Sequence, residues 1–257
     1  MKKDEEVRRL IINLMNSWPS KDYFFHKGWI LRFDNGVTYR ANSVLPLDYY
    51  GSRRTFNRDL DLVEKAYQMY NLPPIFTMHD FYKPSYLCKE LLDKNYREVA
   101  YTVALGGRMI NITHKDVNEN YEYSFQNKRN GDFSYFLSNH SSRSEEQQKI
   151  INRITQRIKI LNKCFIIVKS QDLIIGTLMG VLDLNGYLYL ADIFVDPNYR
   201  RQGIAKSMIY KIIYEWANPI RINMVWLQVE IENKHAIDLY ENIGLKVLFS
   251  YYYLTNS

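Results

Sequence analysis

The regular alternation of apolar segments in residues 144–254 constrains the fold of this chain more than any other feature. "SEEQQKIINRITQRIKILN" has isoleucines at helical spacing after Ser144, a favourable N-cap, and therefore predicts a helix. Asn185-Gly186, between two apolar runs, is typical of a hairpin turn. We expect a helix, three antiparallel strands, a helix, a strand, a helix and a strand, over residues 144–162, 164–170, 173–184, 187–195, 204–216, 223–230, 234–243 and 245–254.

The first half of the chain repeats this order less clearly. A hairpin is expected around Asp34-Asn35-Gly36, followed by a helix, a strand, a helix and a strand, over residues 28–33, 37–44, 58–70, 75–79, 85–95 and 97–105. "LLDKNYREVAYTVAL" resembles "LYENIGLKVLFSYYYL", which indicates a weak internal duplication with a boundary near His114. We predict two domains, 1–113 and 114–257, in an α/β (α+β) fold whose central, mostly antiparallel, twisted sheet is flanked by helices.

Composition narrows the class of protein. With 46% hydrophobic and 24% charged residues, the chain can build an ordinary core. Its two cysteines and five scattered histidines show neither a disulfide framework nor paired metal-ligand spacing, so we expect no metal site and a reducing, cytoplasmic location. No segment has the length of a signal peptide core or a membrane span. The net charge of +6 admits nucleic acid, a membrane surface or an anionic small ligand.

The segment "NYRRQGIAKS" joins a strand to a helix and favours an anion site. The first N–H groups of a helix lack partners within the helix and carry partial positive charge. Gly203 permits close approach of a ligand to the backbone, and small Ala205 keeps the first turn open. Arg200 and Arg201 add permanently charged donors suited to phosphate. The alternative reading is a solvated turn with a convenient glycine.

Two motifs resemble the signatures of the GNAT (Gcn5-related N-acetyltransferase) superfamily. "FVDPNYRRQGIAKSMI" resembles its acetyl-coenzyme A signature, Arg/Gln-x-x-Gly-x-Gly/Ala, at Arg200, Gly203 and Ala205. "ENKHAIDLYENIGL" resembles the second signature, and the matching residues are Asn233, Ala236, Tyr240 and Gly244. The likeness covers roughly residues 144–254. More loosely, the whole chain resembles a tandem group in which a degenerate GNAT-like domain precedes an intact one.

This resemblance implies acetyl-coenzyme A (acetyl-CoA) as co-substrate, without a metal. The backbone from Gln202 to Ala205 would hold the pyrophosphate, and main-chain groups near Ile193 and Val195 would bind the pantetheine arm, in a slot where two strands splay apart. The implied donor-binding residues are Ile193, Phe194, Val195, Arg200, Arg201, Gln202, Gly203, Ile204, Ala205, Lys206, Asn233 and Ala236.

The resemblance also implies catalytic roles. Tyr240 would protonate the departing thiolate, or it packs in the core on one helical face with Ala236. Asp192 would act as general base, or it is a structural partner for an arginine. Asp196 and Glu230 are weaker candidates for the base, and an ordered water chain would also serve.

The N-terminal half lacks the first signature, and Leu92 or a neighbour occupies the position that corresponds to Tyr240 in the repeat. We therefore predict that this half binds no coenzyme A and instead walls off the substrate cleft or stabilises the other half. The residues of its hairpin that would face the cleft, unless they are ordinary sheet residues, are Trp29, Arg32, Arg40 and Asn42.

The resulting hypothesis is an N-acetyltransferase that transfers acetyl directly to a primary amine of a small molecule or peptide. Neither cysteine has a nucleophile setting, which favours direct transfer. A non-catalytic acyl-CoA sensor is the alternative. A nucleic-acid partner is disfavoured because the charges are spread through both halves, and no membrane partner is expected. The tyrosine-rich "SYYYL" strand suggests an edge for a homodimer.

Overall fold

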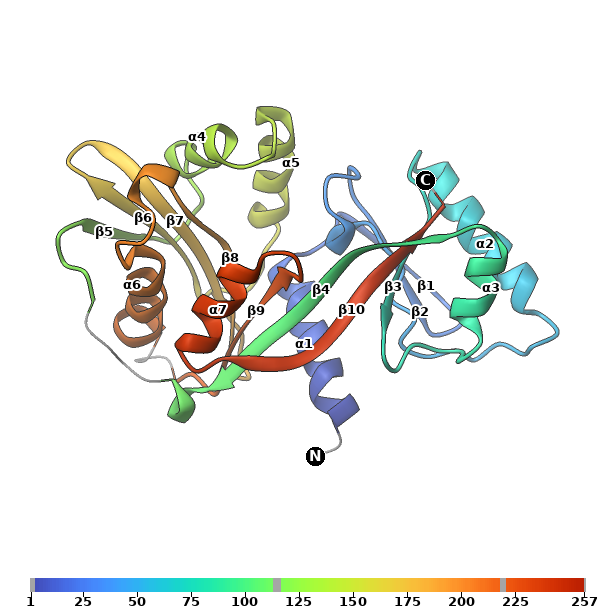
Figure 1. The fold of residues 1–257 in the computed structure, drawn as a ribbon. Coiled ribbons are helices and arrows are strands. Elements are labelled where there is room, and N and C mark those ends of the chain that lie inside the picture. The colour runs from blue at the N-terminus through green and yellow to red at the C-terminus, as the bar shows by residue number, and fades with distance from the viewer. Residues whose placement is uncertain (1–2, 113–116, 218–220, 257) are drawn as a thin grey trace.

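The computed structural model describes residues 3–112, 117–217 and 221–256 (Figure 1). An eight-stranded sheet runs through the whole molecule. In spatial order its strands are β3 (Ile75–His79), β10 (Lys246–Thr255), β4 (Arg97–Arg108), β9 (Met224–Glu230), β8 (Tyr187–Val195), β7 (Leu173–Leu182), β6 (Lys163–Ser170) and β5 (Glu122–Gln126). β8 and β9 run parallel, whereas the other neighbouring strands run antiparallel. The predicted α/β class with a mostly antiparallel sheet is confirmed.

The remaining elements surround this sheet. A separate hairpin is formed by β1 (Asp22–His26) and β2 (Trp29–Phe33). The α-helices are α1 (Lys3–Ser17), α2 (Phe56–Met69), α3 (Leu87–Asp93), α4 (Gly131–His140), α5 (Glu145–Gln156), α6 (Ile204–Lys211) and α7 (Lys234–Asn242). Short 3₁₀ turns cover Tyr39–Ala41, Met109–Asn111 and Pro197–Tyr199, and a π-helical segment, Ile212–Ala217, extends α6.

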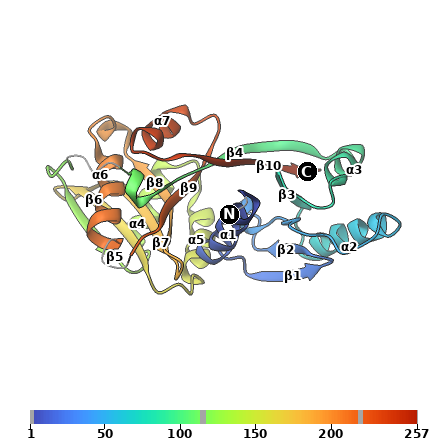
Figure 2. The ribbon, with the colours of Figure 1, turned by 90° about the horizontal axis from the view of Figure 1, so that it is seen from below.

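Both faces of the sheet are covered because successive strand residues point to opposite sides. In β6, Phe165 and Ile167 pack in a core with α1, α4 and α5. Ile166 and Val168 pack in a second core with α6 and α7. Figure 2 shows α6 and α7 apart from α1 and α5, with strands of the sheet between them. A third core, centred on Trp29, joins β2, α2, α3 and β3 in the N-terminal half. The sheet is therefore the middle layer of a three-layer arrangement.

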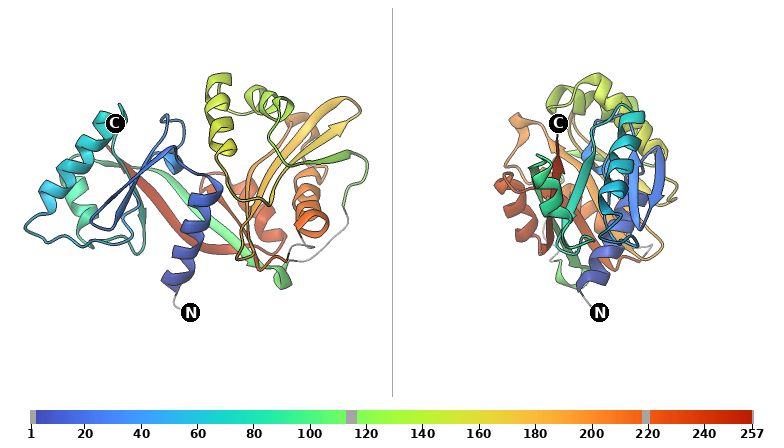
Figure 3. Two further views of the ribbon diagram at one scale, coloured as in Figure 1. Left: turned by 180° about the vertical axis from the view of Figure 1, so that it is seen from behind. Right: turned by 90° about the vertical axis from the view of Figure 1, so that its right-hand side faces the viewer.

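The two halves of the chain exchange their long strands. β4 comes from the first half and lies between β9 and β10, whereas β10 comes from the second half and lies between β3 and β4. Figures 1 and 3 show this pair as a twisted ribbon joining two lobes, with the C-terminus in the lobe of the first half. The order strand, helix, strand, helix, strand recurs as β2–β4 and β8–β10, in agreement with the expected duplication. The boundary near His114 lies outside the described residues, and the division at 113/114 stays a prediction.

One expected hairpin is wrong. Strands were expected over 28–33 and 37–44, but β2 pairs along its length with β1, through a turn at Lys27-Gly28 in which Gly28 has φ +91°. It meets the following segment only in an antiparallel bridge between Ile30 and Leu45. The side chain of Asn42 accepts hydrogen bonds from the N–H groups of Asp34 and Gly36. Residues 34–42 are thus held as a loop by side-chain bonds, which remove the need for a partner strand.

Other differences concern elements that lack a strong local signal. α1, β5 and α4 were not expected at all, and the helix expected over 144–162 ends at Gln156. The strand with "SYYYL" is not an edge, since β10 is paired on both sides. Its tyrosines therefore offer no free edge for a homodimer.

Candidate functional site

The cleft between β8 and β9 begins where these two parallel strands stop pairing. Their last pair is Leu190 with Leu227. Two residues further on, β8 has a bulge that places Asp192 and Ile193 opposite Leu178, and Asp192 adopts φ +49°. A cleft of about 440 Å³ opens there. The predicted site residues that line it are Asp192, Ile193, Phe194, Arg200, Asn233 and Tyr240.

Main-chain groups of β8 point into this cleft. The N–H of Asp196 donates to the carbonyl of Ile175 at 2.9 Å and so faces β7. Because successive residues of a regular strand alternate in direction, the main-chain groups of Val195 face away from β7, whereas Ile193 belongs to the bulge and lines the cleft. The Val195 carbonyl accepts from Arg200 Nε at 3.1 Å, so its N–H remains for a ligand. This is the edge that the sequence predicted for the pantetheine arm.

The turn before α6 has the geometry of an anion site. Gly203 is the N-cap with φ +78°, and a Cβ built there would meet nothing within 4 Å. Arg201 is also left-handed, at φ +62°. Tyr121 donates a hydrogen bond to the Gln202 side chain, and Asn118 Nδ2 donates to the Gln202 carbonyl at 2.8 Å. These bonds hold the turn from outside and leave its inner side open to a ligand.

The other residues of the predicted donor site divide between this turn and the helices. The Ile204 side chain is buried, so only its N–H remains for a ligand, whereas Ala205 is half-buried. The Lys206 ammonium lies 5.9 Å from the ring centre of Tyr210, and the Arg200 guanidinium lies 5.5 Å from that of Phe194. Residues 201–206 come directly after Arg200, which lines the cleft, but they do not line the cleft themselves.

The second signature places two residues of α7 beside β8. The Asn233 side chain accepts from the N–H of Ala236 at 3.3 Å, so it is a helix cap as well as a residue of the cleft. Ala236 is half-buried and packs against the core. Tyr240 is 7% exposed, and burial raises the pKa of its phenol to about 12. The phenol therefore keeps its proton at neutral pH.

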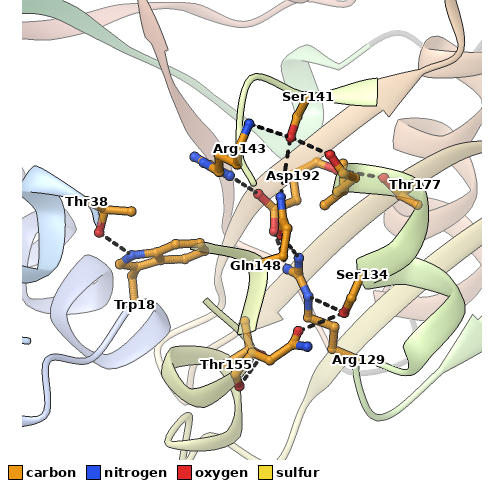
Figure 4. Close-up of polar contacts among 12 residues, drawn as sticks. Trp18, Thr38, Arg129, Ser134, Ser141, Arg143, Gln148, Thr155, Thr177 and Asp192 are labelled. Atoms are coloured by element: carbon orange, nitrogen blue, oxygen red, sulfur yellow. Dashed lines mark hydrogen bonds and ion pairs between the residues drawn. The ribbon is translucent and has the colours of Figure 1, made fainter. Parts of the chain in front are cut away.

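Asp192 is held by two arginines that sequence reasoning did not identify. Its carboxylate lies 2.5 Å from Arg129 Nη1 and 3.4 Å from Arg143 Nη1 (Figure 4). Arg129 also donates to Gln148 Oε1 at 2.6 Å and to Ser134 Oγ at 3.3 Å. Burial acts to raise the pKa of Asp192, but the two guanidinium groups outweigh it and hold the pKa below its usual range. These contacts favour the reading of Asp192 as a structural partner for arginine.

The contribution of the Asp192 ion pair to the free energy of unfolding should decrease in acid. A carboxylate with a lowered folded-state pKa contributes stability above its unfolded pKa of about 3.9, and this contribution is lost as pH falls through the folded value. We expect the difference in unfolding free energy between the wild type and Asp192→Asn to narrow below about pH 4. Urea unfolding at neutral pH and at about pH 3 measures it. A difference that stays constant would contradict the lowered pKa.

The cleft continues into a second cavity of about 350 Å³ that reaches the N-terminal half. Val37, Thr38 and Arg40 contribute to its wall from the first half of the chain. The residues shared by both cavities are Arg40, Ser142, Arg143, Gln228, Val229 and Glu230. Of the four hairpin residues expected to face the cleft, Arg40 alone lines it. Trp29, Arg32 and Asn42 are buried and line neither cavity, so that expectation is wrong for them.

His140 is a further residue of the cleft that the sequence did not reveal. Its Nε2 lies 3.6 Å from Asp196 Oδ2, and its ring lies 4.6 Å from that of Phe136. The sequence offered no reason to place His140 in the cleft, because His140 ends α4, a helix that was not predicted. Arg129 precedes the same helix.

The part of the chain that the structure describes has neither a metal-binding cluster nor a membrane-spanning helix. No cluster of three or more His, Cys, Asp or Glu side chains arranged to hold a metal ion occurs in residues 3–112, 117–217 and 221–256. None of the helices in these ranges has the length and apolarity of a membrane span.

Comparisons with known proteins agree with this geometry. Residues 124–245 match the acetyltransferase (GNAT) family, and residues 5–90 match a family described as probable histone acetyltransferase Rv0428c, C-terminal. The uncharacterized N-acetyltransferase YobR of Bacillus subtilis is 26% identical over 254 residues, which are 97% of this chain and 98% of YobR. Human N-alpha-acetyltransferase 30 is 35% identical over 96 residues, or 35% of this chain and 26% of that protein, so the match spans about a quarter of the human relative.

A solved structure extends the likeness to the whole fold. A GCN5-related N-acetyltransferase from Kribbella flavida superposes with a TM-score of 0.66 at 12% identity, over 96% of this chain and 94% of that one. The family match and the relatives named as N-acetyltransferases indicate an acetyltransferase, and the solved structure shows the same fold. The chain therefore contains a GNAT acetyltransferase family domain, over residues 124–245.

Proposed function

We propose that this protein transfers an acetyl group from acetyl-CoA directly to a primary amine. The observation that carries the proposal is the slot where β8 and β9 part, since Ile193 of β8, Arg200 before α6 and the buried phenol of Tyr240 line one cleft there. The acetyl donor and the class of acceptor are the parts that go beyond membership of the family.

The donor fits the slot by complementary chemistry. The N–H groups of Gln202 to Ala205 and the side chains of Arg200 and Arg201 would bind the pyrophosphate. The pantetheine amides would pair with the edge of β8 at Ile193 and Val195, as an added strand does. The Asn233 amide N–H₂ stays available to the arm, because its capping bond uses the oxygen.

Transfer then needs three events. The amine must lose a proton, and its nitrogen attacks the thioester carbon. The carbon–sulfur bond breaks, with the electron pair leaving on sulfur. Tyr240 donates its phenolic proton to that sulfur, which yields an N-acetyl amide and free coenzyme A. The protonated state that burial imposes on Tyr240 suits this role.

The proton acceptor is better supplied by Glu230 than by Asp192. The carboxylate of Asp192 is occupied by Arg129 and Arg143. Glu230 is exposed, lines both cavities and has no ion pair within the described part of the chain. Glu230 and Ile193 line the same cleft, beyond the last pair of β8 and β9, Leu190 with Leu227. We propose that it accepts the proton of the amine, directly or through water.

The donor site is tested by titration calorimetry with acetyl-CoA. We expect micromolar binding by the wild type and at least a tenfold weaker Kd for the Arg201→Glu, Gly203→Glu variant. Two added carboxylates repel phosphate, and a side chain at φ +78° is strained. A Lys246→Glu control, at the start of β10, adds negative charge outside the cleft and should bind as the wild type does. Equal binding by all three proteins would overturn the assignment.

Turnover separates the enzyme from the alternative, a non-catalytic sensor. Release of free thiol from acetyl-CoA that depends on an added amine, together with mass detection of the acetylated amine, is the result expected. Tight donor binding without acetylation of any amine in a broad panel would favour the sensor.

A further inference from the structure

The junction of the two cavities holds a guanidinium group that the proposed transfer does not use. Arg40 comes from the 3₁₀ turn Tyr39–Ala41 of the N-terminal half and lines both the 440 Å³ cleft and the 350 Å³ cavity. It donates a hydrogen bond to the Tyr189 hydroxyl, and its guanidinium lies 5.1 Å from the ring centre of Trp18. These neutral contacts fix the direction of the side chain without an ion pair, and the Asp192 carboxylate attracts the guanidinium only from a longer distance.

Arg40 differs from Arg143, the other arginine that lines both cavities, in having no ion pair. Arg129 and Arg143 share the Asp192 carboxylate. Within the ranges that the structure describes, no carboxylate lies within 4.0 Å of Arg40. A half-buried guanidinium that faces a cavity has several free N–H donors in a rigid fork, an arrangement that matches a carboxylate.

The same junction carries one unpaired negative charge. Glu230, at the end of β9, lines both cavities and has no ion pair among the described residues. The second cavity is walled by the rings of Tyr39, Tyr251 and Tyr253, which offer apolar faces between the charged groups. The cavity thus combines a fixed positive group, a fixed negative group and an aromatic surface.

From this arrangement we propose that the acceptor is an amine that also bears a carboxylate. The carboxylate binds Arg40, with Arg143 beside it, while the ammonium approaches Glu230 and the reacting end of β8. This inference rests on the proposed function and names the substrate class of the same site. It also gives the N-terminal half a direct part in acceptor recognition, because Arg40 belongs to that half of the chain.

Paired acceptors test the inference. Each pair has one member with a carboxylate and one without: phenylalanine and phenethylamine, tryptophan and tryptamine, lysine and 1,5-diaminopentane, and the dipeptide amides Ala-Asp-NH₂ and Ala-Asn-NH₂. Acetylation by the full-length protein is followed through kcat/KM for each compound. We expect the carboxylate member of at least one pair to be preferred by about tenfold or more, as a charge-assisted bidentate contact provides.

Variants locate the source of that preference. Arg40→Gln should lower the ratio within the pair to near one, mainly through KM, and Arg40→Lys should restore part of it. Arg54→Gln changes an exposed arginine that lines neither cavity and should leave the ratio as in the wild type. Thermal unfolding of each variant shows whether the fold is retained, and the wild-type ratio tests the proposal even where Arg40→Gln does not fold.

The outcomes separate the two proposals. Equal rates within every pair would overturn the acceptor class and leave the acetyl transfer standing. A preference that survives in folded Arg40→Gln would also overturn it. Absence of acetylation with every compound, while acetyl-CoA binds, would overturn the transfer itself and with it this inference.

Discussion

Replacing Tyr240 by Phe is expected to lower kcat about a hundredfold, the scale on which a positioned general acid contributes. The variant removes one hydroxyl and keeps the ring, which is 7% exposed and packs between α7 and the sheet. Unfolding free energy should therefore change little. The Kd for acetyl-CoA should also stay close to the wild-type value, because the phenol acts on the departing sulfur. Steady-state kinetics with thiol detection measures kcat, and calorimetry measures the Kd.

Tyr135→Phe provides the matched control, since Tyr135 is 66% exposed on α4 and lines neither cavity of the cleft. It should turn over as the wild type does. A loss of less than about threefold in Tyr240→Phe, with the donor still bound, would show that sulfur leaves without help from this residue.

Asp192→Asn is expected to cost about 3–5 kcal/mol of unfolding free energy, the scale for removing one partner of a buried ion pair. The side chains of Asp192 and Arg129 are only 6% and 2% exposed. Loss of the carboxylate leaves a buried guanidinium with neutral partners alone, and its desolvation is no longer offset. The bulge of β8 is anchored at the same point, so kcat should fall together with stability. Urea unfolding at neutral pH measures the change.

A double-mutant cycle isolates this interaction. Arg129→Gln combined with Asp192→Asn should cost clearly less than the sum of the two single changes, since the double variant buries no unpaired charge. Arg9→Gln serves as a surface control. Its pair with Glu5 is half-exposed and should contribute little to stability. Strict additivity of Asp192→Asn and Arg129→Gln would contradict a coupled buried pair.

Much of the second half could be predicted because its elements carry local signals. β8 and β3 begin and end where the sequence places them, at Tyr187–Val195 and Ile75–His79, since apolar runs bounded by turn residues specify short strands. The turn at Gly203 could be predicted for the same reason, because a positive φ and a helix start need particular residues. The two family signatures fall on these elements.

The exchange of β4 and β10 could not be predicted, because a strand's own pattern does not tell which strands it will pair with. The ion-pair partners of Asp192 could not be predicted for a similar reason. Its partners Arg129 and Arg143 are 63 and 49 residues away in the chain, and they flank the unforeseen α4. Arg40 was one of four equivalent candidates until the loop over 34–42 showed which of them reaches the cleft.

The central claim is that acetyl-CoA lies in the slot between β8 and β9, with its phosphates at the start of α6. Hydrogen–deuterium exchange of the full chain, with and without saturating acetyl-CoA, tests it most directly. We predict slower exchange at the amides of residues 193–195 and 202–206, with little change in α2 and α3. Protection confined to another cavity, such as the 490 Å³ groove beside Lys128, Lys159 and Lys163, would contradict the account.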